Sequence, residues 1–265
     1  MSWWDQLDKN RGSRPRAVLM MEGDRAAVAE RLTKMVALNG VTVSAQDHWM
    51  PTGVPQYKAG KWDKGPADEA QLDKPNPLVG SAHRQALQEW WLAVPGRAKT
   101  PNWDIASTCT VDGTPGLLLV EAKAHFDELE HAGKSNRGSD DSKLNHDRIG
   151  KAIDEACGAW QAATNLPWGL SRDSHYQLSN RFAWAWKLAS MGIPVVLVYL
   201  GFVNATDMAD NRTLIGSAHE WDRGMKAHAA GVVPDAIWEN RAGFNGVPVI
   251  PLLRTYHQPL PANHP

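Results

Sequence analysis

The chain has 265 residues and a formal net charge of −1 at pH 7, with 28 lysines and arginines against 29 aspartates and glutamates. This balance excludes a global attraction to nucleic acid, so any binding to DNA or RNA would depend on local basic patches. Two cysteines are too few for a disulfide framework, and the longest apolar stretches, such as residues 194–200, are far too short to span a bilayer.

Residues 1–78 are predicted to form an N-terminal extension. The first residues have neither the basic region nor the apolar stretch of a secretory signal, which favours a cytoplasmic protein with no membrane attachment. Apolar residues recur at helical spacing within residues 16–40, with Asp24 as a candidate N-cap and Asn39-Gly40 as the stop. This pattern predicts a helix that is preceded by a short strand over residues 17–21. Residues 46–77 are rich in Pro, Gly, Lys and Asp and predict a long irregular connection.

Residues 79–265 are predicted to form an α/β core that begins with a helix over residues 81–92. Strands are predicted over residues 103–111 and 117–124. The residues between them read Asp-Gly-Thr-Pro-Gly, a composition that favours a hairpin turn. We therefore expect the two strands to form an antiparallel pair.

The remainder of the core alternates helices and strands. The apolar strand over residues 195–200 has side chains suited to burial on both faces, as a central strand of a layered sheet requires. Tryptophan pairs such as Trp90-Trp91 lie in apolar helical patterns and are expected to pack in the core. The elements together predict an α/β fold with a mixed central sheet flanked by helices. The other elements are helices over residues 143–163, 175–190 and 219–230 and a last strand over residues 247–253.

Charged side chains follow an apolar run on the second strand of the predicted hairpin. Glu121 and Lys123 come directly after four apolar residues, and because side chains alternate along a strand they point to the same face. The hairpin partner can bring Asp104 beside them. Two carboxylates at the end of a buried strand make an oxygen-rich site suited to Mg²⁺, and the lysine can orient an attacking water.

A plain ion pair is the alternative interpretation of Glu121 and Lys123, because Glu-x-Lys occurs by chance in most chains of this length. On that interpretation the strand emerges into solvent at Glu121. The context favours a site, because a charged pair on a buried strand costs free energy unless a metal or partner groups compensate.

The order of elements over residues 81–201 resembles the PD-(D/E)XK nuclease superfamily: helix, strand with Asp, hairpin, strand with Glu-x-Lys, helix, strand. The resemblance implies a restriction endonuclease-like fold with a metal-dependent catalytic site. Position by position, it implies that Asp104 and Glu121 are metal ligands and that Lys123 assists the nucleophilic water. It also implies that Glu89, on the helix before the first strand, is a further metal ligand.

The resemblance extends to residues 176–181, which are similar to the glutamine-bearing helix of one branch of this superfamily. It implies that Gln177 and Arg181 contact the substrate. The sequence departs from the family pattern at two points. Arg181 stands where an aromatic residue is expected, and Pro101 lies three residues before Asp104 instead of next to it.

The function that the resemblance implies is hydrolysis of phosphodiester bonds, with Mg²⁺ as the cofactor, Mn²⁺ as a substitute and DNA as the expected substrate. Basic residues near the site, Lys134 and Arg148, are expected to contact backbone phosphates. The sequence leaves the oligomeric state open, a homo-oligomer included.

Two other functions stay open. A nuclease-fold module without turnover would bind nucleic acid or protein; the near-neutral charge favours this module, whereas the intact catalytic set favours an enzyme. A metal-independent α/β protein would carry Glu121 and Lys123 as a surface ion pair. A zinc site made of His125, Glu128 and His131 is disfavoured, because histidines six residues apart lie on different faces of a helix.

Overall fold

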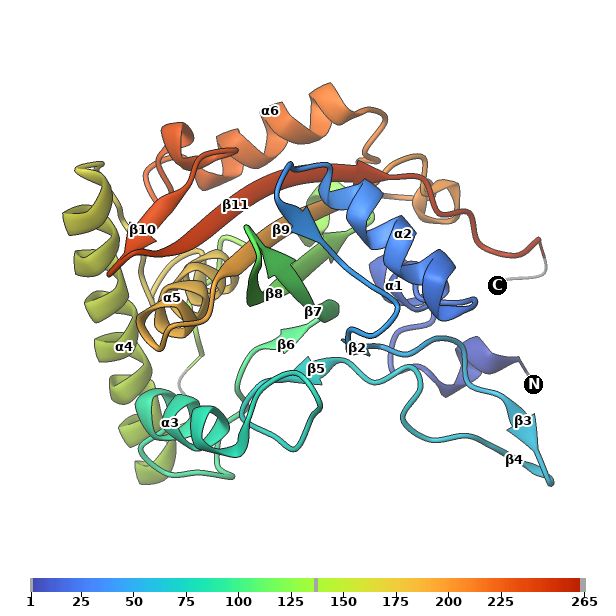
Figure 1. Ribbon diagram of the computed structural model, residues 1–265, viewed down its shortest axis with the longest axis horizontal. Coiled ribbons are helices and arrows are strands. Elements are labelled where there is room, and N and C mark those ends of the chain that lie inside the picture. Colours follow the sequence, from blue (N-terminus) through green and yellow to red (C-terminus); the bar gives the residue numbers. More distant parts are fainter. Residues whose placement is uncertain (1, 136–137, 263–265) are drawn as a thin grey trace.

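A curled mixed sheet forms the centre of the computed structural model, which describes residues 2–135 and 138–262 (Figure 1). Its strands lie in the order β1-β7-β8-β9-β11-β10, and β2 also pairs with β7. The predicted α/β class with a mixed central sheet is thus confirmed. The strands are β1 (Val41–Thr42), β2 (Trp49–Met50), β7 (Ile105–Val111), β8 (Thr114–Lys123), β9 (Val195–Phe202), β10 (Ala242–Phe244) and β11 (Val247–Tyr256).

The hairpin predicted around residues 112–116 joins β7 to β8, and the two strands are antiparallel. Asp112 and Gly113 form the turn with φ angles of 49° and 81°, the left-handed conformation of a tight hairpin. β9 lies parallel to β8 on one side and to β11 on the other, and β10 returns antiparallel to β11. β9 is buried along its whole length, as its apolar sequence predicts.

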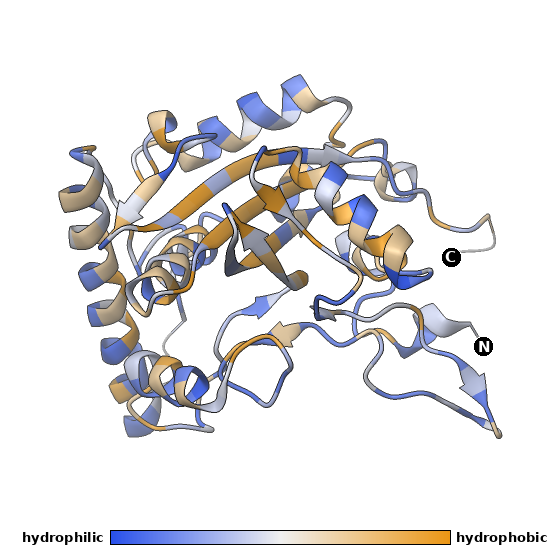
Figure 2. Cartoon of the chain, in the orientation of Figure 1, coloured by the Kyte–Doolittle hydropathy of each residue, from blue (hydrophilic) through white to orange (hydrophobic). Residues whose placement is uncertain are grey.

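Helices cover both faces of the sheet (Figure 1). Side chains alternate along β8, so that Leu117 and Leu119 enter one hydrophobic core while Leu118 and Val120 enter the other. Figure 2 shows that β9 and the middle of β11 are largely hydrophobic and that α6 turns hydrophilic residues outward. The first core is covered by α3 (Ser81–Trp91), α4 (Asp140–Thr164), α5 (Tyr176–Ser190) and α6 (Ala218–Ala229), and the second by α1 (Ser13–Met20) and α2 (Arg25–Val36).

The helix α5 is buried on nearly every side, because it lies between the sheet and α4 (Figure 1). Its Trp184 is fully buried and packs edge to face against Trp91 of α3, with ring centroids 5.7 Å apart. The predicted core role of these tryptophans is confirmed. A helix held so completely fixes the position of the polar side chains on its first turns.

The N-terminal segment forms a helix where the sequence predicts a short strand. The strand predicted over residues 17–21 is wrong, because residues 17–20 form the second half of α1 and Met21 is its C-cap. A short apolar run suits a buried helix as well as a strand, and here it packs against β8. The predicted N-terminal helix is confirmed as α2, and Asp24 caps it by accepting a hydrogen bond from Ala27 N at 2.9 Å.

Residues 1–78 contribute α1, α2, β1 and β2 to the central sheet and its second core. The boundary predicted after residue 78 stays a prediction. The connection over residues 46–77 also holds the hairpin of β3 (Tyr57–Lys58) and β4 (Lys61–Trp62), and β5 (Ala70–Gln71), which pairs with β6 (Asn102–Trp103). No helix in the described part of the chain combines the length and the hydrophobicity needed to cross a membrane.

Candidate active site

Asp104, Glu121 and Lys123 line one cavity of about 470 Å³ at the end of β8. The strand register explains why they meet. Ile105 lies opposite Val120, which puts Asp104 next to the end of β8. All three side chains lie on the face of the sheet that α5 covers, since their neighbours Ala106 and Leu119 belong to the first hydrophobic core.

A dense set of ion pairs holds Glu121 in place. Lys123 Nζ lies 2.6 Å from Glu121 Oε1, and Arg181 Nε donates to Glu121 Oε2 at 2.7 Å. Arg181 Nη2 forms an ion pair with the same oxygen at 2.5 Å. Gln177 Oε1 accepts a further hydrogen bond from Lys123 Nζ at 2.7 Å. Glu121 and Lys123 are only 2% and 6% exposed, so the surface ion pair considered from the sequence does not form.

Both predicted α5 residues are thus part of the site. Gln177 binds the lysine and Arg181 binds the glutamate, and each therefore positions a charged group on β8. Arg181 also donates to the carbonyl oxygen of Asn102 at 2.6 Å and lies over the Trp103 ring, with Cζ 4.6 Å from its centroid. Their predicted contact with a substrate stays a prediction.

The charges of this group set each other's pKa. Burial on its own raises the pKa of Glu121, but the charges of Arg181 and Lys123 hold it below its usual value, so Glu121 is ionised. Burial opposes the charge of Lys123, yet Glu121 and Asp104 raise its pKa and keep it an ammonium. Asp104 differs: burial first, and then the charges of Glu121 and Glu69, raise its pKa to about 8, although the charge of Lys123 acts in the opposite direction.

Asp104→Asn is expected to stabilise the metal-free protein by about 1–3 kcal/mol at pH 8, and by less at lower pH. The carboxyl ionises at a pKa of about 4 when unfolded and about 8 when folded. Between these values the folded wild type keeps a proton that the unfolded chain has lost, so its stability falls as the pH rises, by at most about 1.4 kcal/mol per pH unit. Urea unfolding of both proteins with a chelator, from about pH 5 to pH 8, measures the difference. A difference that does not change with pH contradicts the assigned pKa.

The structure adds a carboxylate that the sequence reasoning missed, Glu69. β5 pairs with β6 so that Ala70 lies opposite Trp103, and this register puts Glu69 beside Asp104. Asn102 Nδ2 donates to Glu69 Oε2 at 2.9 Å. Glu69 and Asp104 line the same cavity, and the charge of Glu69 contributes to the raised pKa of Asp104.

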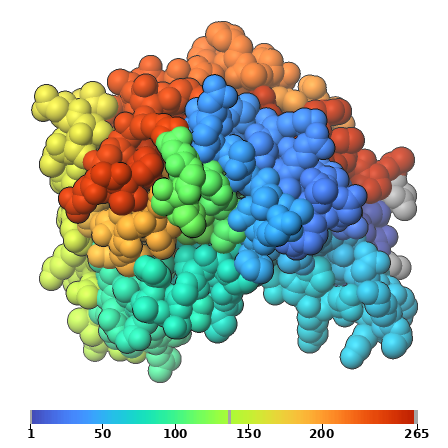
Figure 3. All heavy atoms as spheres, viewed as in Figure 1, coloured from blue at the N-terminus to red at the C-terminus, as the bar shows by residue number. Residues whose placement is uncertain are grey.

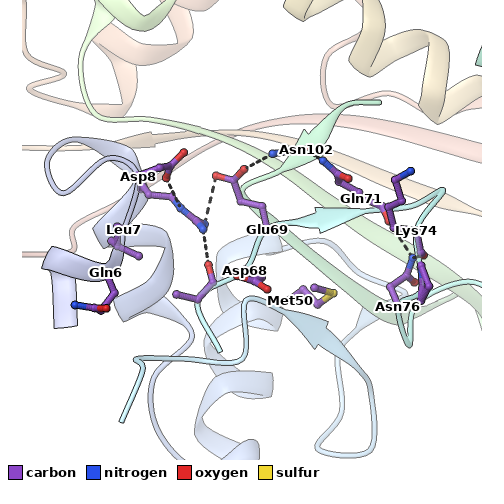
Figure 4. A pocket seen from close by; sticks show the side chains of 13 residues that line it. Gln6, Leu7, Asp8, Met50, Asp68, Glu69, Gln71, Lys74, Asn76 and Asn102 are labelled. Carbon is purple, nitrogen blue, oxygen red and sulfur yellow. Dashed lines mark hydrogen bonds and ion pairs between the residues drawn. The ribbon is translucent and has the colours of Figure 1, made fainter. Parts of the chain in front are cut away.

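Glu69 also borders a second cavity of about 490 Å³, shown in Figure 4. Glu69 and Asn102 line both cavities, as do Asp8 and Arg14 from the N-terminal segment. The two hollows therefore adjoin at Glu69. Figure 3 shows that the surface is indented between the segment that carries α3 and the β3–β4 hairpin.

The remaining predicted residues lie elsewhere. Glu89 is exposed on α3, where its carboxylate accepts from Gln85 Nε2 at 2.7 Å, and it does not line the cavity that holds Asp104. Arg148 donates to the carbonyl oxygen of Glu89 at 2.6 Å and so ties α4 to α3. Lys134 lies over the Tyr176 ring at 4.8 Å and lines a separate cavity of about 380 Å³.

No protein-family model, no curated protein and no solved structure matches the chain. The chemistry of the site is therefore the basis for assigning a function.

The three residues weighed for zinc do not form one group. His125 is buried beside two carboxylates, with Nδ1 3.5 Å from Asp127 Oδ2 and Nε2 3.8 Å from Glu128 Oε1. Glu128 also accepts from Ala124 N at 2.7 Å, which closes the turn after β8. His131 lies apart from them, next to two histidines from distant parts of the chain.

Proposed function

We propose that the chain is a metal-dependent nuclease of the PD-(D/E)XK class, with a restriction endonuclease-like core, that hydrolyses phosphodiester bonds in DNA. One observation carries this proposal. Glu121 and Lys123 on β8 and Asp104, the residue just before the neighbouring strand β7, line one cavity. The buried lysine between two carboxylates is the arrangement that the family's chemistry needs.

The donor set of the cavity fits a divalent cation that prefers oxygen. Among the described residues no salt bridge reaches Asp104, whose hydrogen bond comes from Ala122 N at 2.7 Å. Burial first, and then the charges of Glu121 and Glu69, raise the pKa of Asp104, while the charge of Lys123 acts in the opposite direction. Asp104 and Glu121 would hold Mg²⁺ or Mn²⁺, with Glu69 as the third carboxylate in place of Glu89. The chemistry that such an ion supplies when bound is polarisation of the phosphate and a lower pKa of its water.

Lys123 has the geometry to orient the attacking water. An ammonium group has three hydrogen-bond donors. Glu121 and Gln177 accept two hydrogen bonds from Lys123 in the described structure, which leaves a third donor for a water or a phosphate oxygen. Because Glu121 and Asp104 raise the pKa of Lys123, it stays charged and can offset negative charge on the phosphate.

One observation favours a second function, a nuclease-fold module that binds nucleic acid or protein without cleaving it. Lys123 and Arg181 already engage both oxygens of Glu121, which weakens its attraction for a cation. A structural ion-pair network of this kind needs no metal. A cleavage assay distinguishes the two functions, because the nuclease cuts DNA and the binding module leaves it intact.

Incubation of the purified protein with linear, circular and single-stranded DNA and with RNA tests the proposal. We expect cleavage of DNA with Mg²⁺ or Mn²⁺ and none with a chelator. Glu69→Gln is expected to slow cleavage about 10- to 100-fold, because a carboxylate of the site is lost, and Glu89→Gln is the matched control with little effect. Intact substrates under every metal condition would support the binding module instead.

A further inference from the structure

His131, His175 and His228 form a cluster outside the carboxylate site. They come from three separate segments: the loop that follows the short helix η2 (Phe126–Glu128), the residue that caps the start of α5, and the last turn of α6. One nitrogen of each ring lies within 4.8 Å of the other two. The ring centroids are 4.6 to 5.0 Å apart.

Backbone hydrogen bonds fix two of these histidines relative to each other. His175 N donates to His131 O at 2.9 Å, and Tyr176 N donates to Ala132 O at 3.0 Å. His175 has a φ of 46°, a left-handed conformation that a non-glycine residue adopts only when its surroundings hold it there. The two rings are thus held together before any ligand binds.

Packing alone does not satisfy the nitrogens of the cluster. His228 is 8% exposed, and among the described residues its Nδ1 has no hydrogen-bond partner. A buried polar atom without a partner destabilises the folded protein, and a bound ligand would remove that cost. His131 Nδ1 and His175 Nε2 lie 2.7 Å apart and face each other, although only one of them can donate when both rings are neutral.

We propose that His131, His175 and His228 bind a transition-metal ion of the zinc class, with a water molecule as fourth ligand. Two imidazole nitrogens bound to a tetrahedral zinc ion lie about 3.3 Å apart, since each lies about 2.0 Å from the metal. The observed separations, from 2.7 Å to within 4.8 Å, bracket this value. Small side-chain rotations complete the site.

The donor type separates this site from the carboxylate site. Imidazole nitrogens prefer zinc, cobalt, nickel or copper, whereas Mg²⁺ prefers oxygen. The site goes beyond the proposed nuclease function and does not depend on it. It has a structural consequence, because His175 begins the helix that carries Gln177 and Arg181, so the metal holds the start of α5 against α6.

Titration of the chelator-treated protein with Co²⁺ tests the proposal, because bound tetrahedral Co²⁺ absorbs visible light. The wild type is expected to show the visible spectrum of one tetrahedral Co²⁺ per chain, and Zn²⁺ is expected to abolish that spectrum. His131→Ala should weaken binding at least about 100-fold, because one of three ligands is lost. His131 is exposed, so this variant should fold. His219→Ala, at an exposed histidine of the same α6 helix as His228, is the matched control.

Two further measurements keep the test decisive. Asp104→Asn should keep the Co²⁺ spectrum, which distinguishes this site from the carboxylate site. His228→Ala should lose the spectrum, and circular dichroism checks its fold. Equal affinity in His131→Ala and His219→Ala overturns the proposal, as does a wild-type protein that binds neither Co²⁺ nor Zn²⁺.

Discussion

Lys123→Met is expected to reduce DNA cleavage by about a thousandfold while changing the affinity for Mn²⁺ less than tenfold. The substitution removes the charged donor for the attacking water but keeps an unbranched chain of similar size. Glu121 keeps its pairing with Arg181 at 2.7 Å, so the carboxylate stays in place. Single-turnover cleavage, with calorimetry of Mn²⁺ binding, measures the two quantities separately.

Lys143→Met is the matched control for this variant. Lys143 is exposed on α4 and pairs with Asp140 at the surface, with Nζ 3.2 Å from Oδ1. Its loss should change cleavage less than about twofold, since surface pairs contribute little. Similar cleavage rates for the two variants would show that Lys123 has no part in the reaction.

Arg181→Met is expected to lower the free energy of unfolding by about 3–5 kcal/mol. Arg181 is 5% exposed and binds Glu121, the carbonyl oxygen of Asn102 and the side chain of Asn180. Its removal leaves Glu121 buried with only half of its counter-charge. Urea unfolding measured with a chelator gives the loss without a contribution from bound metal.

Arg172→Met provides the comparison, because Arg172 pairs with the exposed Asp173 at 2.9 Å and should contribute less than about 1 kcal/mol. Combining Glu121→Gln with Arg181→Met should recover part of the loss, because the uncompensated charge is then gone. Equal losses from Arg181→Met and Arg172→Met would contradict the buried network.

The sequence predicts the central part of the fold well because the signals there are local. The apolar residues of β9 and the Asp-Gly turn between β7 and β8 each depend on neighbouring residues, and the structure confirms both elements. The strand predicted at residues 17–21 is wrong because a short apolar run has no periodicity that separates a strand from a buried helix. β1 and β10, with two and three residues, are too short to give a pattern.

The same contrast holds for the site. Glu121 and Lys123 are two residues apart on one strand, so alternation alone puts them on one face. Glu69 reaches Asp104 only through the pairing of β5 with β6, and a two-residue strand in an irregular segment gives no signal for that pairing. The three clustered histidines come from three elements, and His131 contacts His175 through tertiary packing that local spacing cannot reveal.

Titration calorimetry with Mn²⁺ tests the central claim, that Asp104 and Glu121 together hold a divalent cation. The His131→Ala background removes the histidine cluster as a competing site, so the heat reports the carboxylate site alone. We expect one Mn²⁺ per chain in this background and at least a 100-fold weaker affinity once Asp104→Asn is added. Equal binding with and without Asp104→Asn, or no binding in the His131→Ala protein, would contradict the account.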